Sequence, residues 1–246
     1  MSSPSPSHGG NRRLTVIIAV VGGIVVLGAA AAVFGPAFYR DVIVGEAPPA
    51  PTVGGSTPAA ESSPAPAGDP LAELDGSWAA SEGSFAGYRV DEVLNGTDVT
   101  VVGRTEDVEA EVEVADLAVT AATVTVDVGS IATDEGARDA YFRDNALQVS
   151  DFPTATFTLT EPLEATSAPE AGSEQTVEAA GELTLHGVTQ AVTAELQVAF
   201  DGRTAEVAGS IPVTFADYGV QAPSLGFVSV EPEGFVEFHL VLDKAE

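Results

Sequence analysis

The chain has 246 residues, no cysteine, and 37 acidic residues against 9 Lys and Arg, so its formal net charge is −28. This charge excludes an ordinary nucleic-acid-binding face, which needs basic side chains to neutralise phosphates. The missing thiols exclude disulfides, Cys-ligated metals, thiol catalysis and a lipid-modified cysteine. Because 45% of the residues are hydrophobic, the acidity belongs to a folded protein and not to a disordered tail.

The N-terminal region contains an uncharged stretch that is long enough to cross a membrane. Residues 1–13 are polar and end in Arg12-Arg13, and residues 14–35 contain no charge. At a rise of about 1.5 Å per residue, such a helix spans a hydrocarbon core of ~30 Å. The preceding basic residues predict a cytoplasmic N-terminus, an extracytoplasmic C-terminal part and a single-pass location in the cell membrane. The alternative is a cleaved signal peptide, for which residues 29–32 offer cleavage sites.

Residues 36–70 have the composition of a linker. Seven prolines lie between residues 41 and 70, among Ala, Gly, Ser and Thr. Such a stretch has too few apolar side chains to form a core and is typical of a semi-extended tether. We therefore predict one folded extracytoplasmic domain, residues 71–246. This domain holds 33 acidic and 6 basic residues, which indicates a strongly solvated acidic surface.

Apolar and polar residues alternate with period two along most of the domain. In residues 191–200, Val192, Ala194, Leu196, Val198 and Phe200 share one face, and a similar row runs from Val236 to Leu242. This pattern predicts antiparallel strands with one buried and one solvated face. The turn dipeptides Asn95-Gly96, Asp201-Gly202 and His186-Gly187 separate such strands. The domain is therefore predicted to be all-β, either a barrel of about eight strands or a sandwich.

Residues 133–148 break the alternation and predict one short helix near a barrel end. Asp134 and Arg138 are four residues apart, as are Asp139 and Arg143, so each pair suits an ion pair on a helix. Pro153 prevents the helix from continuing.

Several motifs, in order, resemble the YceI-like family. They are Thr133-Asp134 with Arg138-Asp139, the aromatic-proline start of a strand at residues 151–157, the hairpin at residues 181–189, and residues 211–219. The membrane anchor and the Pro-rich linker are similar to those of exported actinobacterial members. The resemblance implies a lipocalin-like, extended antiparallel β-barrel. It also implies an elongated apolar pocket for a polyisoprenoid chain with a quinone or phosphate head group, and no established catalytic reaction.

The small inward residues of the predicted strands, such as Ala194 and Ala205, leave room for a pocket. Aromatic and aliphatic side chains on the matched motifs suit the dispersion contacts of an isoprenoid chain, although each also suits a filled core. Arg138 is a candidate for the head group, with pairing inside the helix as the alternative. The candidate lipid-binding residues are Phe142, Phe157, Leu183, Leu185, Phe215, Tyr88, Tyr218 and Arg138.

The domain offers little catalytic chemistry. Its two histidines, His186 and His239, are both predicted to be exposed, and no hydrolase, phosphate-loop or metal-ligand motif is present. We therefore predict a binding protein without enzymatic activity, cofactor or metal, whose partners are an isoprenoid lipid and the membrane. The alternative is a stalked β-domain for protein interaction or adhesion, which would have a filled core instead of an internal cavity.

Overall fold

The structure is a computed structural model that describes residues 47–54, 74–165, 173–224 and 226–245. The predicted membrane segment, residues 14–35, and most of the predicted linker lie outside these residues. In the part of the chain that the structure describes, no helix has both the length and the apolar character needed to cross a membrane.

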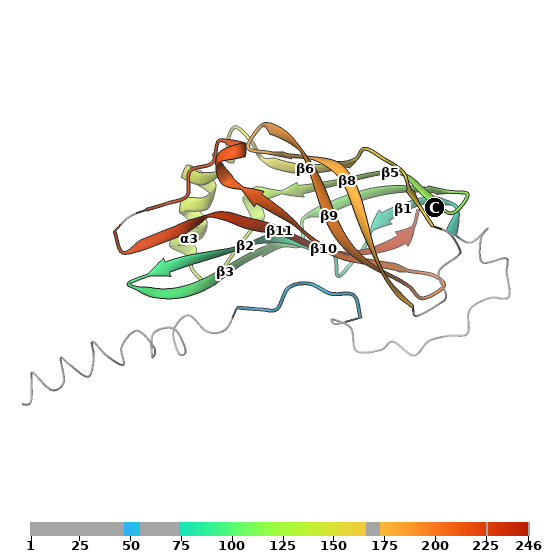
Figure 1. The fold of residues 1–246 in the computed structure, drawn as a ribbon, viewed down its shortest axis with the longest axis horizontal. Coiled ribbons are helices and arrows are strands. Elements are labelled where there is room, and N and C mark those ends of the chain that lie inside the picture. The colour runs from blue at the N-terminus through green and yellow to red at the C-terminus, as the bar shows by residue number, and fades with distance from the viewer. Residues whose placement is uncertain (1–46, 55–73, 166–172, 225, 246) are drawn as a thin grey trace, which may run out of the picture. The chain divides into compact units, whose positions relative to one another are not determined.

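Eight antiparallel strands form a closed barrel, which confirms the barrel over the sandwich (Figure 1). The circuit closes because the first strand pairs with the last, with Trp78 opposite Lys244. Each strand contributes one inward apolar row, as the period-two pattern predicts. In spatial order the strands are β1 (Gly76–Ala80), β4 (Val108–Ala115), β5 (Ala118–Asp127), β6 (Thr154–Leu159), β8 (Glu174–Leu185), β9 (Val188–Phe200), β10 (Ala205–Thr214) and β11 (Val228–Lys244).

Strand β11 is long enough to pair with two different strands along the same edge. Its C-terminal end pairs with β1, and the part from Val228 to His239 pairs with β2 (Phe85–Leu94). Strand β3 (Thr97–Thr105) pairs with β2 in turn, so the β2–β3 hairpin extends the sheet beside the closed barrel. A two-residue strand, β7 (Leu163–Glu164), pairs with the start of β5.

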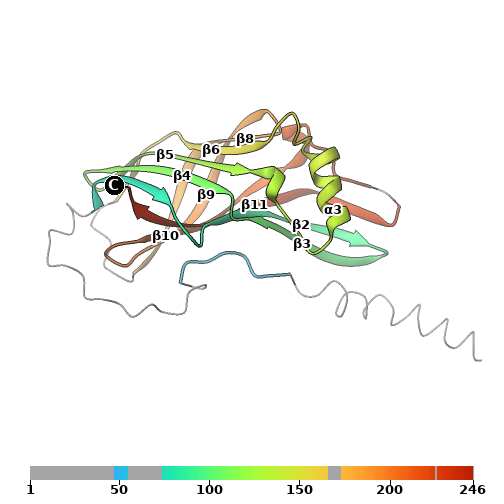
Figure 2. The same cartoon turned by 180° about the vertical axis from the view of Figure 1, so that it is seen from behind.

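The predicted helix is present in two parts. An α-helix, α3 (Gly136–Tyr141), continues into a π-helical turn, η3 (Phe142–Ala146), and both views place α3 beside the β2–β3 hairpin (Figure 2). The predicted pair of Asp134 and Arg138 is confirmed at 2.8 Å. The predicted pair of Asp139 and Arg143 is corrected, because the buried Asp139 carboxylate accepts hydrogen bonds from the backbone N–H and the hydroxyl of Thr133.

The described part also contains two short 3-10 helices, η2 (Val128–Ser130) and η4 (Phe215–Tyr218). The predicted hairpin turns are confirmed at Asn95-Gly96 and His186-Gly187, where both residues of each pair have positive φ, as a type I′ turn requires. A third such turn, Asp116-Leu117, has φ values of 52° and 65° without any glycine.

Part of the expected linker lies against the barrel. In residues 47–54, the carbonyls of Pro48 and Pro49 accept hydrogen bonds from side chains of β2 and β3, and the Val53 side chain is buried. The prediction that His239 is exposed is wrong: this residue is 4% exposed. It does point away from the barrel interior, but Phe85 stacks on its ring, and Glu206, which accepts a hydrogen bond from the 47–54 segment, lies 3.8 Å from it.

Candidate functional site

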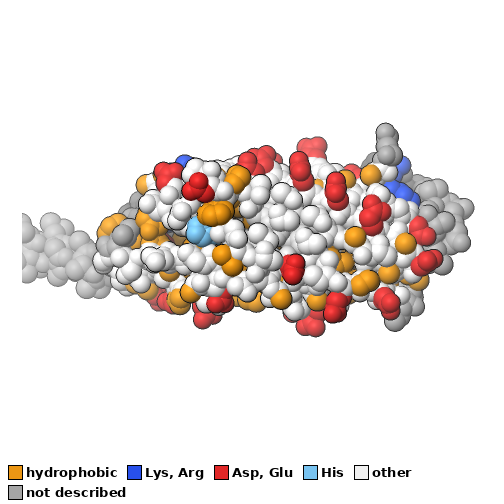
Figure 3. Space-filling view, turned by 90° about the horizontal axis from the view of Figure 1, so that it is seen from above, with side chains coloured by type: hydrophobic (Ala, Val, Ile, Leu, Met, Phe, Trp, Pro, Cys, Tyr) orange, Lys and Arg blue, Asp and Glu red, His pale blue; other side chains and the backbone are white. Residues whose placement is uncertain are grey.

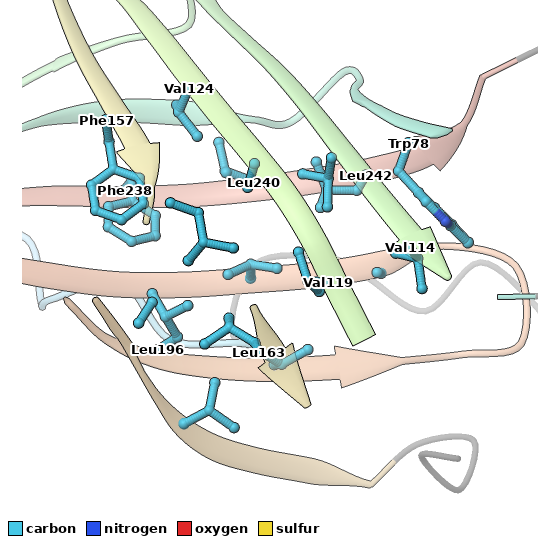
Figure 4. A pocket seen from close by; sticks show the side chains of 18 of the residues that line it. Trp78, Val114, Val119, Val124, Phe157, Leu163, Leu196, Phe238, Leu240 and Leu242 are labelled. Atoms are coloured by element: carbon cyan, nitrogen blue, oxygen red, sulfur yellow. The ribbon is translucent and has the colours of Figure 1, made fainter. Parts of the chain in front are cut away.

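The inward rows of the barrel strands enclose a cavity of about 490 Å³. Strand β11 contributes four consecutive inward residues, Val236, Phe238, Leu240 and Leu242, and β9 contributes Leu196, Val198 and Phe200. Figure 4 shows side chains from several strands pointing toward a common space. Alternation places every second residue of each strand inside, so the same pattern that predicts the strands also supplies the lining.

Small side chains keep this interior hollow. Ala122, Ala179 and Ala205 line the cavity at positions where larger residues would fill it. Three lining side chains are polar: Thr156, Glu164 and Gln175. The remainder are aliphatic or aromatic, so the cavity offers hydrophobic and dispersion contacts and few hydrogen bonds.

The exposed lining residues show where the cavity opens. Glu164 and Ala165, in and after β7, and Gln175 at the start of β8 line the cavity but are exposed to solvent. Leu117 lines the same region, and its carbonyl accepts a hydrogen bond from Ala165. The positive φ of 65° at Leu117 costs a leucine about 1–2 kcal/mol. The chain thus tolerates backbone strain that presents an apolar side chain at the opening.

Trp78 also lines the cavity, and Figure 4 shows it beside Val114. It is the only tryptophan in the chain and is 4% exposed. Its indole N–H donates to the carbonyl of Leu74 at 2.9 Å, and its ring packs edge-on against Phe200 with centroids 6.1 Å apart. A buried indole with its one donor satisfied is a rigid apolar wall.

Two of the predicted lipid-binding residues, Phe157 and Leu183, line the cavity. They face each other as a pair between β6 and β8. The Phe157 ring covers Gly181, where an added Cβ would lie 2.3 Å from the ring's Cζ atom. Glycine at position 181 therefore lets this ring lie flat against β8, which gives the first residue of the matched hairpin at residues 181–189 a role in packing.

Five other predicted residues pack outside the cavity lining. Tyr88 and Phe142 stack with centroids 4.8 Å apart, in a cluster with residues of η2 and the region after η3. Burial raises the pKa of the Tyr88 phenol above its ordinary value. Phe215 and Tyr218 belong to η4 and pack against a second cluster, where burial likewise raises the pKa of Tyr218. Leu185 contacts both clusters.

Arg138 forms ion pairs within the protein. Its guanidinium contacts Asp134 at 2.8 Å and the buried carboxylate of Glu92, in β2, at 3.4 Å. Arg138 is not among the residues that line the cavity. Its position matches the alternative of pairing at the helix, and it also ties α3 to the β2–β3 hairpin.

Most of the lining residues that are not among the candidate lipid-binding residues belong to the inward apolar rows of the predicted strands. The alternation places Leu196, Val198, Leu240 and Leu242 on one face of their strands. It does not identify them as cavity lining, because alternation cannot distinguish a filled barrel from a hollow one. The described residues contain no cluster of three or more His, Asp or Glu side chains arranged to hold a metal ion.

Comparisons with known proteins give one family and several similar structures. Residues 79–242 match the YceI-like domain. A polyisoprenoid-binding domain from Saccharophagus degradans, implicated in plant cell wall breakdown, is 20% identical, with 69% of this chain and 98% of that chain covered and a TM-score of 0.57. BcnA from Burkholderia cenocepacia is 23% identical, with 63% and 95% covered and a TM-score of 0.48. The YCEI protein of Campylobacter jejuni is 16% identical, with 58% and 85% covered and a TM-score of 0.45.

No curated protein sequence matches the chain. At 20% identity, the likeness to the Saccharophagus domain supports the barrel fold alone. The domain match, in contrast, extends over more than half of the chain and includes at least part of every strand of the closed barrel. The chain therefore belongs to the YceI-like domain family.

Proposed function

We propose that this protein is a membrane-tethered extracytoplasmic binding protein for an isoprenoid-type lipid. The observation that carries the proposal is the apolar cavity of about 490 Å³ inside the closed barrel. Small-molecule pockets have volumes of about 300–1,000 Å³. A methyl-branched hydrocarbon chain needs apolar contact along its length and few hydrogen bonds, and the lining matches this need. The polyisoprenoid-binding domain from Saccharophagus degradans supports the same ligand class.

The charge of the lining favours an uncharged head group. Among the described residues that line the cavity, Glu164 is the one that carries a charge, and it is exposed at the opening. The described lining residues include no Lys or Arg. A phosphate at this opening would meet a carboxylate without a compensating cation. A prenyl quinone therefore fits the site better than a polyprenyl phosphate.

The tether and the surface charge suit brief contact with the bilayer. Residues 14–35 would anchor the chain, and the linker would keep the opening of the barrel close to the membrane that supplies the lipid. Acidic side chains are scattered over the face in Figure 3, and a protein with a net charge of −28 is repelled by anionic head groups. Such a protein is suited to transport, storage or sequestration of the lipid and not to stable docking on the bilayer.

Native mass spectrometry of the full chain, extracted from bacterial membranes in mild detergent, tests this proposal. We expect an added mass that organic extraction identifies as a prenyl lipid. The delipidated chain should then show saturable quenching of Trp78 fluorescence by a prenyl quinone, and weaker binding of a polyprenyl phosphate. A chain that carries no lipid and binds neither compound would refute the proposal, and recovery of the chain in the soluble fraction would refute the anchor.

A further inference from the structure

The outer face of the sheet carries a second group of interacting side chains, separate from the cavity. The Arg104 guanidinium lies 4.5 Å from the centroid of the Phe85 ring, and the His239 ring stacks on Phe85 with centroids 5.4 Å apart. Arg89 donates to the buried carboxylate of Glu237. The outer-face cluster is defined here as Phe85, Arg89, Arg104, Glu206, Glu237 and His239.

The 47–54 segment makes polar contacts with this cluster at both of its ends. Arg89 Nη2 donates to the Pro48 carbonyl at 2.7 Å, and Arg104 Nη2 donates to the Pro49 carbonyl at 3.0 Å. At the other end, the Gly54 N–H donates to Glu206 Oε2 at 3.0 Å. Prolines have no N–H and hold an extended backbone, so exposed carbonyls are the polar groups by which such a segment is recognised.

Apolar burial accompanies these hydrogen bonds. The Val53 side chain is 5% exposed, although its neighbour Thr52 is exposed. His239 is 4% exposed, with its Nε2 atom 3.8 Å from Glu206 and with no hydrogen-bond partner on either ring nitrogen in the described residues. A histidine on an outer sheet face would be hydrated if the face were open. The Glu206 Oε2 atom that accepts from the Gly54 N–H also lies 3.8 Å from His239 Nε2, so the segment lies next to this buried histidine.

We propose that the outer-face cluster is a docking site for the 47–54 segment, and that docking acts as a latch on the linker. The effect of docking on the distance between the barrel and the bilayer rests on the membrane anchor of the proposed function. With the segment docked, residues 36–46 connect the anchor to the barrel, and their 11 residues span at most about 40 Å. With the segment released, residues 36–73 provide 38 residues and a reach of at most about 130 Å. The latch thus sets how far from the bilayer the barrel can carry its lipid.

Hydrogen exchange of the full chain in phosphatidylcholine vesicles tests the docking. Val53→Asp places a charge in the buried position of the segment and leaves every barrel residue in place. Thr52→Asp, next to it and exposed, is the matched control. We expect the Gly54 amide to exchange at least about tenfold faster in Val53→Asp than in the wild type, and at the wild-type rate in Thr52→Asp. Equal rates in the wild type and Val53→Asp would overturn the docking.

Energy transfer between the barrel and the bilayer tests the latch. Because the chain has no cysteine, a donor can be attached at one introduced cysteine, Thr193→Cys, on the exposed face of β9. With an acceptor on the lipid head groups, transfer should fall in Val53→Asp and stay unchanged in Thr52→Asp. Unchanged transfer in a released, membrane-bound chain would overturn the latch. Failure of the chain to stay with the vesicles would overturn the anchor and its reach, while the exchange rates would still decide the docking.

Discussion

Filling the cavity from one wall should make the protein more stable and, at the same time, unable to bind its lipid. The substitution is Ala122→Phe, on β5, where the alanine lines the cavity. The adjacent Ala121 is exposed on the opposite face of the same strand, so Ala121→Phe is the matched control.

The magnitude follows from the volume of the cavity. Cavities lined by apolar side chains cost roughly 24 cal/mol per Å³, so 490 Å³ left empty corresponds to about 12 kcal/mol relative to a filled core. Burying one phenylalanine side chain recovers about 1.5–3 kcal/mol, less about 1 kcal/mol for its restricted rotation. We expect the free energy of unfolding of the delipidated Ala122→Phe protein to rise by about 0.5–2 kcal/mol. The change in Ala121→Phe should stay within about 0.5 kcal/mol.

Chemical denaturation of the delipidated proteins measures the first effect, and quenching of Trp78 by a prenyl quinone measures the second. Ala122→Phe should lose the quinone's saturable quenching, whereas Ala121→Phe should keep it. The reasoning is refuted if Ala122→Phe is destabilised, because the interior would then be too tightly packed to be a pocket. It is also refuted if Ala122→Phe is stabilised and still binds the quinone with unchanged affinity.

Three further substitutions test other parts of the structure. Leu117→Gly should relieve positive-φ strain and stabilise the fold by up to about 1 kcal/mol in urea denaturation. A bound prenyl quinone should dissociate faster from this variant, and slower release would contradict the place of Leu117 at the opening. Burial raises the pKa of Tyr88 in the folded state, so the protonated phenol contributes fully to the free energy of unfolding below about pH 10. This contribution is lost as the pH rises through the folded-state pKa. Tyr88→Phe should therefore lose less unfolding free energy than the wild type between about pH 9 and 11, and identical pH profiles would contradict the shift. Arg89→Ala should cost about 3–5 kcal/mol by leaving the buried Glu237 unpaired, and the double change Arg89→Met with Glu237→Leu should cost less; equal losses would contradict the role of the pair.

The strands of the barrel could be predicted because each one buries a single face, so its sequence alternates. The row from Val236 to Leu242 and the row of Leu196, Val198 and Phe200 all face inward, as their spacing predicts. The type I′ turns could be predicted because Asn-Gly and His-Gly accept positive φ. Both the strand alternation and the turn dipeptides depend only on residues that are close together in the sequence.

What could not be predicted depends on segments that are distant in the sequence. His239 alternates outward and is nevertheless buried: Phe85 stacks on its ring, and Glu206, which binds residue 54, lies beside it. Tyr88 of β2 stacks on Phe142 at the end of α3, and Arg138 of α3 pairs with Glu92 of β2, so these predicted residues join α3 to β2 and do not line the cavity. A period of two identifies which face is inside but gives no depth along the barrel.

The pairing of β1 with β11 has a consequence for how the protein is made. Strand β1 gains its second neighbour only when β11 has emerged, after the seven other strands of the circuit. Until then the barrel is an open sheet, and the row that includes Trp78 and Val112 faces water. Closure between segments so far apart in the sequence is slow, because the loop entropy must be lost before the contacts form. The nascent chain therefore has a period in which an apolar lipid could enter sideways, between strands, before the wall is complete.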